Sequence, residues 1–269
     1  MSTSGQWQLD GNAAELYERY VVRHILGPWV PGLLDVAAVR PGERVLDVAC
    51  GTGAVARAAA QRVGASGRVT GLDLNAGMLA VARALPAPPG APITWIQRDA
   101  ADTQLSAGTF DLVVCQQGLQ FFPDKIAALR DLRRVLVSSG RLAISVWRTT
   151  GVYNSAVGQA LGQHVGIDVA SRFCASREVP AGEELVRLAV AAGFQDVKLQ
   201  VQQRTARLPS PEDFVLGHLA ATPVASDVKA MGNPARAALG SAVSRLLSAY
   251  KEGNGLAFPE EVNIVSASA

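Results

Sequence analysis

Residues 45–53 read VLDVACGTG and carry the strongest structural signal in the chain. Apolar β-forming residues surround one carboxylate, Asp47, and a short turn with two glycines, Gly51 and Gly53, follows. The alanine-rich run at 54–63 then predicts a helix. Such a loop turns backbone N–H groups and the positive end of a helix dipole toward a ligand. Asp47 would repel a phosphate and attract a cation, such as an amino group or a sulfonium.

Strand-like and helix-like patterns alternate from residue 45 to residue 147. This alternation predicts a parallel sheet with right-handed crossovers and helices on both faces. We therefore expect an α/β fold, a Rossmann-like, doubly wound, mostly parallel seven-stranded sheet with helical cap insertions. The run at 110–115 is almost entirely apolar and is expected at the centre of the sheet. Strands are expected at 45–48, 68–72, 93–97, 110–115 and 142–147, and helices at 54–63, 76–85 and 124–137, the last stopped by Ser138-Ser139-Gly140.

The residues outside this alternation predict a lid and a cap within a single compact domain. Residues 13–26 have the pattern of an amphipathic helix and form most of an expected N-terminal helical lid at 1–40. The ligand-binding core is expected at 41–148. Residues 149–269 are expected to supply the cap insertions and the last two strands of the sheet. In that region we expect irregular structure at 149–180, a helix at 183–192, strands at 196–204 and 256–267, and mostly helix at 209–255, with the cap insertions at 149–180 and 207–255.

Composition narrows the function classes. A formal net charge of +2 over 269 residues argues against a dedicated nucleic-acid surface. No apolar run reaches the length needed to span a bilayer, and the first residues are too polar for a secretion signal. The three cysteines form no CxxC pair and no even disulfide set. We expect a cytoplasmic protein without a membrane or nucleic-acid partner.

Acidic residues follow three consecutive predicted strands. Asp47 ends the first, Asp73 ends the second and Asp99 follows the third, while Gln116 follows the fourth. In a parallel sheet, the carboxyl ends of the strands meet at the edge where ligands bind. An acid after the second strand can accept both ribose hydroxyl groups, and Asp99 with a backbone N–H can read an adenine edge. Together with Asp47, these positions fit a nucleoside that carries an amino acid better than they fit a pyrophosphate.

At this point the chain resembles the class I S-adenosylmethionine-dependent methyltransferases, most closely the branch with the ubiquinone/menaquinone C-methyltransferases and many small-molecule enzymes of secondary metabolism. Five motifs in order carry the resemblance across residues 40–150. The segments AAELYERYVV (13–22) and FPEEVNIVSA (258–267) are also similar to that branch. The five motifs are VLDVACGTG (45–53), GLDLN (71–75), RDAAD (98–102), FDLVVCQQGLQFFPD (110–124) and LRRVLVSSGRLAISVW (132–147).

The resemblance implies S-adenosylmethionine as methyl donor, S-adenosylhomocysteine as product and a set of cofactor-binding residues. Asp73 would bind the ribose, Leu74 and Met78 would pack near the adenine, and Asp99 with Ala100 would bind its edge. Tyr17 and Tyr20 would close over the cofactor. The methionine end would contact the glycine loop and the end of the fourth strand, through Asp47, Ala49, Cys50, Gly51, Gly53, Gln116 and Gln117.

The acceptor is expected to be a small hydrophobic or aromatic molecule, methylated by in-line displacement on carbon, oxygen or nitrogen. Gln120 and Phe121 are expected in its pocket. His24 and His164 are candidates for a general base, since imidazole titrates near neutral pH. No His/Asp/Glu set has metal-ligand spacing, so a metal-independent enzyme is expected. A homodimer is compatible with the sequence.

Other functions remain open from the sequence. Residues 51–56 satisfy the GxGxxA pattern of an NAD-dependent dehydrogenase, in which Asp73 would bind the adenosine ribose. Asp47 would crowd a pyrophosphate there, and Asp99 would have no evident role. A second alternative keeps the fold and the ligand but lacks methyl transfer. The chain would then be a protein that binds S-adenosylmethionine or S-adenosylhomocysteine, or a cyclase.

Overall fold

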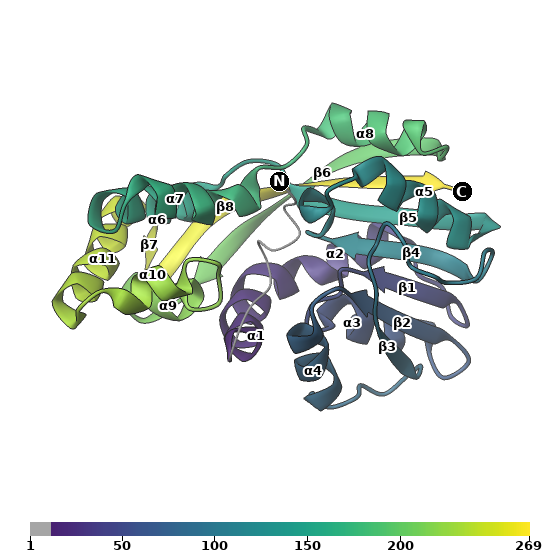
Figure 1. The fold of residues 1–269 in the computed structure, drawn as a ribbon, viewed down its shortest axis with the longest axis horizontal. Coiled ribbons are helices and arrows are strands. Elements are labelled where there is room, and N and C mark those ends of the chain that lie inside the picture. Colours follow the sequence, from purple (N-terminus) through teal and green to yellow (C-terminus); the bar gives the residue numbers. More distant parts are fainter. Residues whose placement is uncertain (1–11) are drawn as a thin grey trace.

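A computed structural model describes residues 12–269, so the first part of the predicted lid, residues 1–11, lies outside the described residues. The sheet confirms the predicted α/β class and is mostly parallel (Figure 1). It has eight strands, one more than predicted, because a two-residue strand pairs with the last one. The strands are β1 (Arg44–Val48), β2 (Arg68–Asp73), β3 (Ile93–Gln97), β4 (Phe110–Gln116), β5 (Leu136–Trp147), β6 (Gln195–Leu208), β7 (Lys251–Glu252) and β8 (Gly255–Ser268).

The strand order is β3-β2-β1-β4-β5-β8-β6, with β7 on β8. Strands β1 to β5 pair in parallel, whereas β8 runs antiparallel to both β5 and β6. β4 is the central strand, as its apolar sequence predicts, and its residues 112–115 are fully buried. The carboxyl ends of β1, β2 and β4 therefore lie next to one another at one edge of the sheet.

Helices cover both faces of the sheet and form a separate cap. α5 and α8 pack on one face, and α2 and α3 pack on the other. The α-helices are α1 (Ala13–Leu16), α2 (Val30–Val36), α3 (Ala54–Val63), α4 (Ala76–Ala84), α5 (Lys125–Val135), α6 (Val152–His164), α7 (Ile167–Cys174), α8 (Gly182–Ala191), α9 (Pro211–Leu219), α10 (Ala225–Ala230) and α11 (Asn233–Leu246). The other helices are the π-helix η2 (Tyr17–Leu26) and the 3₁₀ turns η3 (Gly27–Trp29), η4 (Leu119–Phe121), η5 (Ala175–Arg177) and η6 (Ser248–Tyr250).

The cap has its own apolar core. β6 and β8 extend beyond the parallel strands, and α6, α7, α9, α10 and α11 gather around these extensions (Figure 1). Tyr153 of α6 and Phe214 of α9 are almost completely buried there, together with Phe258 of β8. The two long strands belong to both the sheet and the cap, so they connect the cap core directly to the sheet.

Two local predictions are wrong. The helix predicted at 124–137 ends at Val135, and the Ser138-Ser139-Gly140 turn lies inside β5, where its register with β4 is irregular. The backbone N–H of Thr109 donates to the Val135 carbonyl (2.8 Å) and draws the chain into the sheet before the turn residues are reached. Residues 149–180, expected to be irregular, are largely the helices α6 and α7, stabilised by burial in the cap core.

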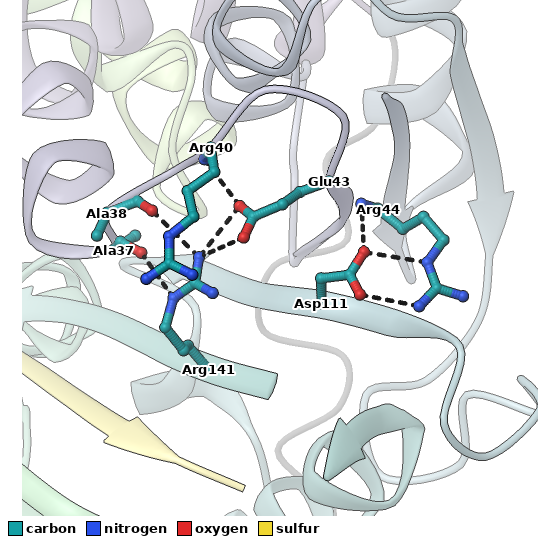
Figure 2. A network of polar contacts seen from close by, with 7 residues as sticks. All are labelled: Ala37, Ala38, Arg40, Glu43, Arg44, Asp111 and Arg141. Atoms are coloured by element: carbon teal, nitrogen blue, oxygen red, sulfur yellow. Dashed lines mark hydrogen bonds and ion pairs between the residues drawn. The ribbon is translucent and has the colours of Figure 1, made fainter. Parts of the chain in front are cut away.

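A polar network fixes the opposite, amino-terminal edge of the sheet (Figure 2). Arg44 donates from its backbone N and its Nε to Oδ2 of Asp111 (2.8 and 3.0 Å) and from Nη2 to Oδ1 (2.8 Å). Arg141 donates to both carboxylate oxygens of Glu43 and to the Ala38 carbonyl that follows α2. These contacts tie β1, β4, β5 and the N-terminal helices together on the side away from the ligand edge.

Candidate functional site

A cavity of about 630 Å³ opens at the carboxyl ends of the strands. Its walls come from the N-terminal helix η2, from the loops that follow β1, β2, β3 and β4, and from the cap. Twelve of the residues predicted from sequence for the cofactor or acceptor line it. They are Tyr17, Ala49, Gly51, Asp73, Leu74, Met78, Asp99, Ala100, Gln116, Gln117, Gln120 and Phe121.

Other predicted residues do not line this cavity. Asp47, Cys50 and Gly53 are not among the lining residues, and their contact with a cofactor stays a prediction. The Tyr20 ring packs on Phe214 and over Gly217 in the cap. Tyr17 and Tyr20 would share one face of an α-helix, but η2 is a π-helix with more residues in each turn, so their side chains diverge.

The two histidines proposed as bases also lie away from this cavity. His24 packs edge-on against Phe214 and lines a void of only about 20 Å³. His164 is exposed at the end of α6, since it follows the last buried turn of that helix. A base role for either residue would need a movement that brings its imidazole to the cavity.

The glycine loop has the backbone that its sequence predicts. Gly51 and Gly53 have φ values of +54° and +86°, and Ala49 also lies in the left-handed region at +54°. α3 begins directly after Gly53, so the loop leads into a helix amino terminus. A Cβ at Gly53 would collide with the Trp95 indole, so this position needs glycine for space as well as for conformation.

Asp73 connects the end of β2 to this loop. Its Oδ2 accepts from the Gly51 N–H (2.7 Å) and its Oδ1 accepts from the Asn75 N–H (2.8 Å). Burial raises the pKa of the Asp73 carboxyl, and the backbone hydrogen bonds partly oppose that rise. The carboxylate thus lines the cavity in a fixed orientation, with lone pairs left for a further pair of hydroxyl groups.

Asp47 is buried below the loop. Its Oδ2 accepts from the Ala56 N–H (2.9 Å), while Oδ1 has no hydrogen-bond partner in the described part of the chain. Burial raises the pKa of the Asp47 carboxyl to about 8, and the nearby Asp73 charge also raises it. An ionised carboxylate here needs a cation close to it, and the ammonium of an amino-acid tail bound above the loop would meet that need.

Asp99 and Ala100 form the far rim of the same region. Asp99 is exposed and its Oδ1 accepts from the Ala101 N–H (2.8 Å), while Ala100 is buried. Met78 of α4 lines the same cavity and is buried. An apolar slot with an acidic rim can accommodate a flat ring that carries an amino group.

The N-terminal helix is fastened to the loop by contacts that the sequence did not predict. Glu18 accepts from the Thr52 hydroxyl (2.5 Å) and pairs with Arg57 of α3 (3.4 Å). Gln116 donates from Nε2 to the Leu26 carbonyl at the end of η2 (3.0 Å). Burial and the neighbouring Asp73 raise the pKa of Tyr17, so its phenol stays protonated beside Gly51.

The cap end of the cavity is lined by residues absent from the sequence-based site. Polar Asn154, Arg177 and His218 are each less than 9% exposed, and Phe173 lies beside them. Arg177 pairs with Glu260 (3.0 Å), with both side chains 5% exposed, and its guanidinium lies 3.6 Å above the Trp147 ring. These residues come from β5, α6, α7, η5, α9 and β8, and no local sequence pattern links them.

In residues 12–269, no group of three His, Cys, Asp or Glu side chains could hold a metal ion. Each helix described there is too short or too polar to cross a bilayer.

Comparisons with known proteins agree with this geometry. A family model for a methyltransferase domain matches residues 45–140. The 2-phytyl-1,4-naphtoquinone methyltransferase of Synechococcus elongatus is 35% identical over 187 residues, covering 63% of this chain and 78% of that protein. The ubiquinone/menaquinone biosynthesis C-methyltransferase UbiE of Cupriavidus taiwanensis is 35% identical over 181 residues, covering 63% and 74%.

A solved structure with the same fold is phosphoethanolamine N-methyltransferase 2 of Haemonchus contortus, in complex with phosphomonomethylethanolamine and S-adenosylhomocysteine. It superposes with a TM-score of 0.55 at 19% identity, over 90% of this chain and 52% of that one. The fold and the glycine-loop site define a class I S-adenosylmethionine-dependent methyltransferase. The chain belongs to this family, in the branch that includes the ubiquinone/menaquinone C-methyltransferases.

The dinucleotide alternative does not fit the sheet. A dinucleotide-binding sheet has the order 3-2-1-4-5-6 with parallel neighbours. Here the antiparallel strand β8 is inserted between β5 and β6. This topology and the similarity to methyltransferases both argue against an NAD-dependent dehydrogenase.

Proposed function

We propose that this protein transfers the methyl group of S-adenosylmethionine to a small, uncharged, hydrophobic or aromatic acceptor. The observation that carries the proposal is one continuous cavity with two different ends. Asp73, Asp99 and the glycine loop form one end, and the aromatic residues Phe121, Phe122 and Phe173 line the part toward the cap. A polar ligand and an apolar ligand can therefore lie in contact inside one enclosure.

The residues at the first end fit the cofactor. Asp73 would bind the ribose hydroxyl groups, Leu74 and Met78 would pack on the adenine, and Asp99 would accept from its amino group. The orphaned Oδ1 of Asp47 fits a cationic amino-acid tail above the loop. When bound, S-adenosylmethionine supplies an electrophilic methyl group on a sulfonium.

The contribution of the chain is positioning in a dry site. The hydrogen bonds from Thr52 to Glu18 and from Gln116 to the Leu26 carbonyl hold η2 over the loop. In this position η2 would limit the entry of water. The aromatic walls keep the acceptor against the donor, so the reacting atoms can be collinear without a large loss of entropy at the transition state. Exclusion of water also strengthens each electrostatic contact in the site.

Two observations support an apolar acceptor: the aromatic residues in the cavity wall and the names of the relatives. Phe173 is 3% exposed and Trp147 is 5% exposed, so both present apolar surface to the interior rather than to solvent. The two named relatives are a 2-phytyl-1,4-naphtoquinone methyltransferase and a C-methyltransferase of ubiquinone/menaquinone biosynthesis. A flat, apolar ring system is therefore the acceptor class that we propose, with methylation on carbon, oxygen or nitrogen left to experiment.

The direct test uses S-adenosylmethionine labelled in the methyl group and a lipophilic metabolite extract. We expect label in an organic-soluble product and an equal amount of S-adenosylhomocysteine. Binding of S-adenosylhomocysteine without any transfer would indicate a binding protein instead. Conversion of an extract component without consumption of the methyl donor would indicate a cyclase.

A further inference from the structure

A buried tyrosine–histidine pair stands at the cap end of the cavity. The Tyr153 hydroxyl lies 2.9 Å from Nδ1 of His218, and the two side chains come from α6 and α9. His218 lines the cavity, whereas Tyr153 lies behind it in the apolar core of the cap. Phe173 and Phe214 pack against the imidazole at ring-centroid distances of 5.7 Å each. These aromatic contacts hold the imidazole of His218 in one orientation. The Tyr153 hydroxyl is then the neighbour that can determine its tautomer.

The hydrogen bond selects the tautomer of His218. Tyr153 is 1% exposed, and Nδ1 is the one hydrogen-bond partner of its hydroxyl within the described residues. A buried O–H that donates to nothing is costly, so the phenol donates to Nδ1. Nδ1 is then the acceptor, and the ring proton is on Nε2, which has no hydrogen-bond partner in the described chain.

His218 is also uncharged. Burial, with a smaller contribution from the nearby Arg177 charge, lowers its pKa to about 3. An imidazole of such low basicity that already carries its proton on Nε2 is poorly suited to act as a general base. It is suited to donate a hydrogen bond.

A second buried polar group faces the same space. Asn154 is 4% exposed and lines the cavity, and its side-chain amide makes no hydrogen bond to the described residues. The amide can therefore offer its donors and its acceptor to a polar ligand in the cavity. The positive charge of Arg177 is balanced by Glu260, so this end of the cavity favours no strongly anionic group.

We propose that His218 and Asn154 form a subsite that binds a carbonyl or hydroxyl oxygen of an uncharged acceptor, with His218 donating from Nε2 and Tyr153 positioning its ring. The inference rests on the proposed methyl-transfer function and adds a requirement to it. The acceptor must carry an oxygen on the side that faces the cap. An acceptor that presents only hydrocarbon to the cap would leave Nε2 of His218 and the amide of Asn154 without hydrogen-bond partners.

The tautomer can be measured without an acceptor. The ¹⁵N chemical shifts of histidine-labelled protein separate the Nδ1–H and Nε2–H forms, and His218→Gln identifies the signal of His218 by its loss. We expect the Nε2–H form, unchanged from about pH 5 to pH 8, because the ring stays neutral over that range. In Tyr153→Phe we expect a mixture of tautomers. An Nδ1–H form or a charged ring in the wild-type protein would overturn the proposal.

The oxygen preference can be measured with two compounds of the same shape. 1-Tetralone carries a ring carbonyl, and tetralin lacks it. We expect protein saturated with S-adenosylhomocysteine to bind 1-tetralone about tenfold or more tightly than tetralin. His218→Leu should remove most of this ratio, while His218→Gln, which keeps an N–H donor, should retain part of it. Equal affinities in the wild-type protein, or no binding of either compound, would overturn the proposal.

The two proposals fail in different ways. If the wild-type protein does not bind S-adenosylhomocysteine, or transfers no labelled methyl group, the proposed function is refuted. Normal methyl transfer together with no oxygen preference, or with the other tautomer, would refute only the role of His218 and Asn154.

Discussion

The carboxylate of Asp73 accepts a hydrogen bond from the backbone N–H of Gly51 at 2.7 Å, so the end of β2 holds the glycine loop that follows β1. A second hydrogen bond, from the Asn75 N–H, fixes the other carboxylate oxygen. One side chain thus shapes the loop and, under the proposed function, would also hold the ribose.

Replacing this carboxylate should weaken cofactor binding. We expect Asp73→Ala to reduce the affinity for S-adenosylhomocysteine more than tenfold, a loss above about 1.4 kcal/mol, because a charged acceptor and two backbone anchors disappear. Isothermal titration calorimetry measures the effect. Asp102→Ala is the matched control, since Asp102 is exposed nearby but does not line the cavity. Equal affinity of Asp73→Ala and wild type would refute the ribose assignment.

Asp47 should make stability and binding respond to pH in opposite directions. The folded-state pKa of about 8 lies above the ordinary 3.8, so folding retains a proton on Asp47. Its contribution to stability is therefore lost as the pH rises from 3.8 through about 8. A cationic ligand prefers the ionised form, so affinity for S-adenosylhomocysteine should increase between about pH 6 and pH 8.

Asp47→Asn tests both effects in one protein. At pH 8 we expect a melting temperature about 2–4 °C above that of wild type, because a buried charge without a partner is removed. Calorimetry should show weaker binding of S-adenosylhomocysteine and no rise of affinity with pH. If Asp47→Asn binds S-adenosylhomocysteine as tightly as wild type, with the same pH dependence, Asp47 does not contribute to cofactor binding.

Gly53 tests the space that the glycine loop requires. Its φ of +86° is left-handed, so alanine costs about 1 kcal/mol through its conformation, and the added Cβ would meet the Trp95 indole. In urea unfolding, we expect Gly53→Ala to cost at least about 1 kcal/mol more in the wild-type protein than in a Trp95→Ala background, where the indole is absent. Equal losses in the two backgrounds would show that the indole moves aside freely.

The Arg44–Asp111 pair should matter for stability and not for binding (Figure 2). It is partly exposed, at 43% and 29%, so we expect Asp111→Ala to cost only about 1 kcal/mol at pH 7. The hydrogen bond from Arg44 lowers the pKa of Asp111, so the stabilisation is complete above the ordinary 3.8 and is lost as the pH falls through the lower folded value. A double-mutant cycle with Arg44→Ala that shows no coupling at pH 7 would contradict this.

The Arg177–Glu260 pair should behave differently because it is buried. Glu260→Ala leaves a guanidinium unpaired and should destabilise the fold by about 3–5 kcal/mol. Arg177→Met combined with Glu260→Leu should recover most of that loss, since apolar side chains can fill the same volume. Urea unfolding measures both. A double variant as unstable as Glu260→Ala would show that the charges themselves stabilise the cap.

Local sequence patterns were enough to predict the parallel core and several residues that line one end of the cavity. Asp47, Gly51, Asp73 and Asp99 belong to short segments, each a strand and the loop after it. Alternating strands and helices bring such loops to one edge of a sheet, so positions along the chain translate directly into positions in space. The central position of β4 could be predicted separately, because its sequence is almost entirely apolar and such strands are buried on both faces.

The tertiary structure decided the rest. Whether Ser138-Ser139-Gly140 ends a helix or lies in β5 depends on pairing with β4, and the direction of Tyr20 depends on the π-helical turn of η2. His218 and Asn154 meet at the cavity only because α6 and α9 pack on the long extensions of β6 and β8. Side chains from separate helices leave no joint pattern in the sequence. Burial, which makes His218 neutral, is likewise a property of the packed chain.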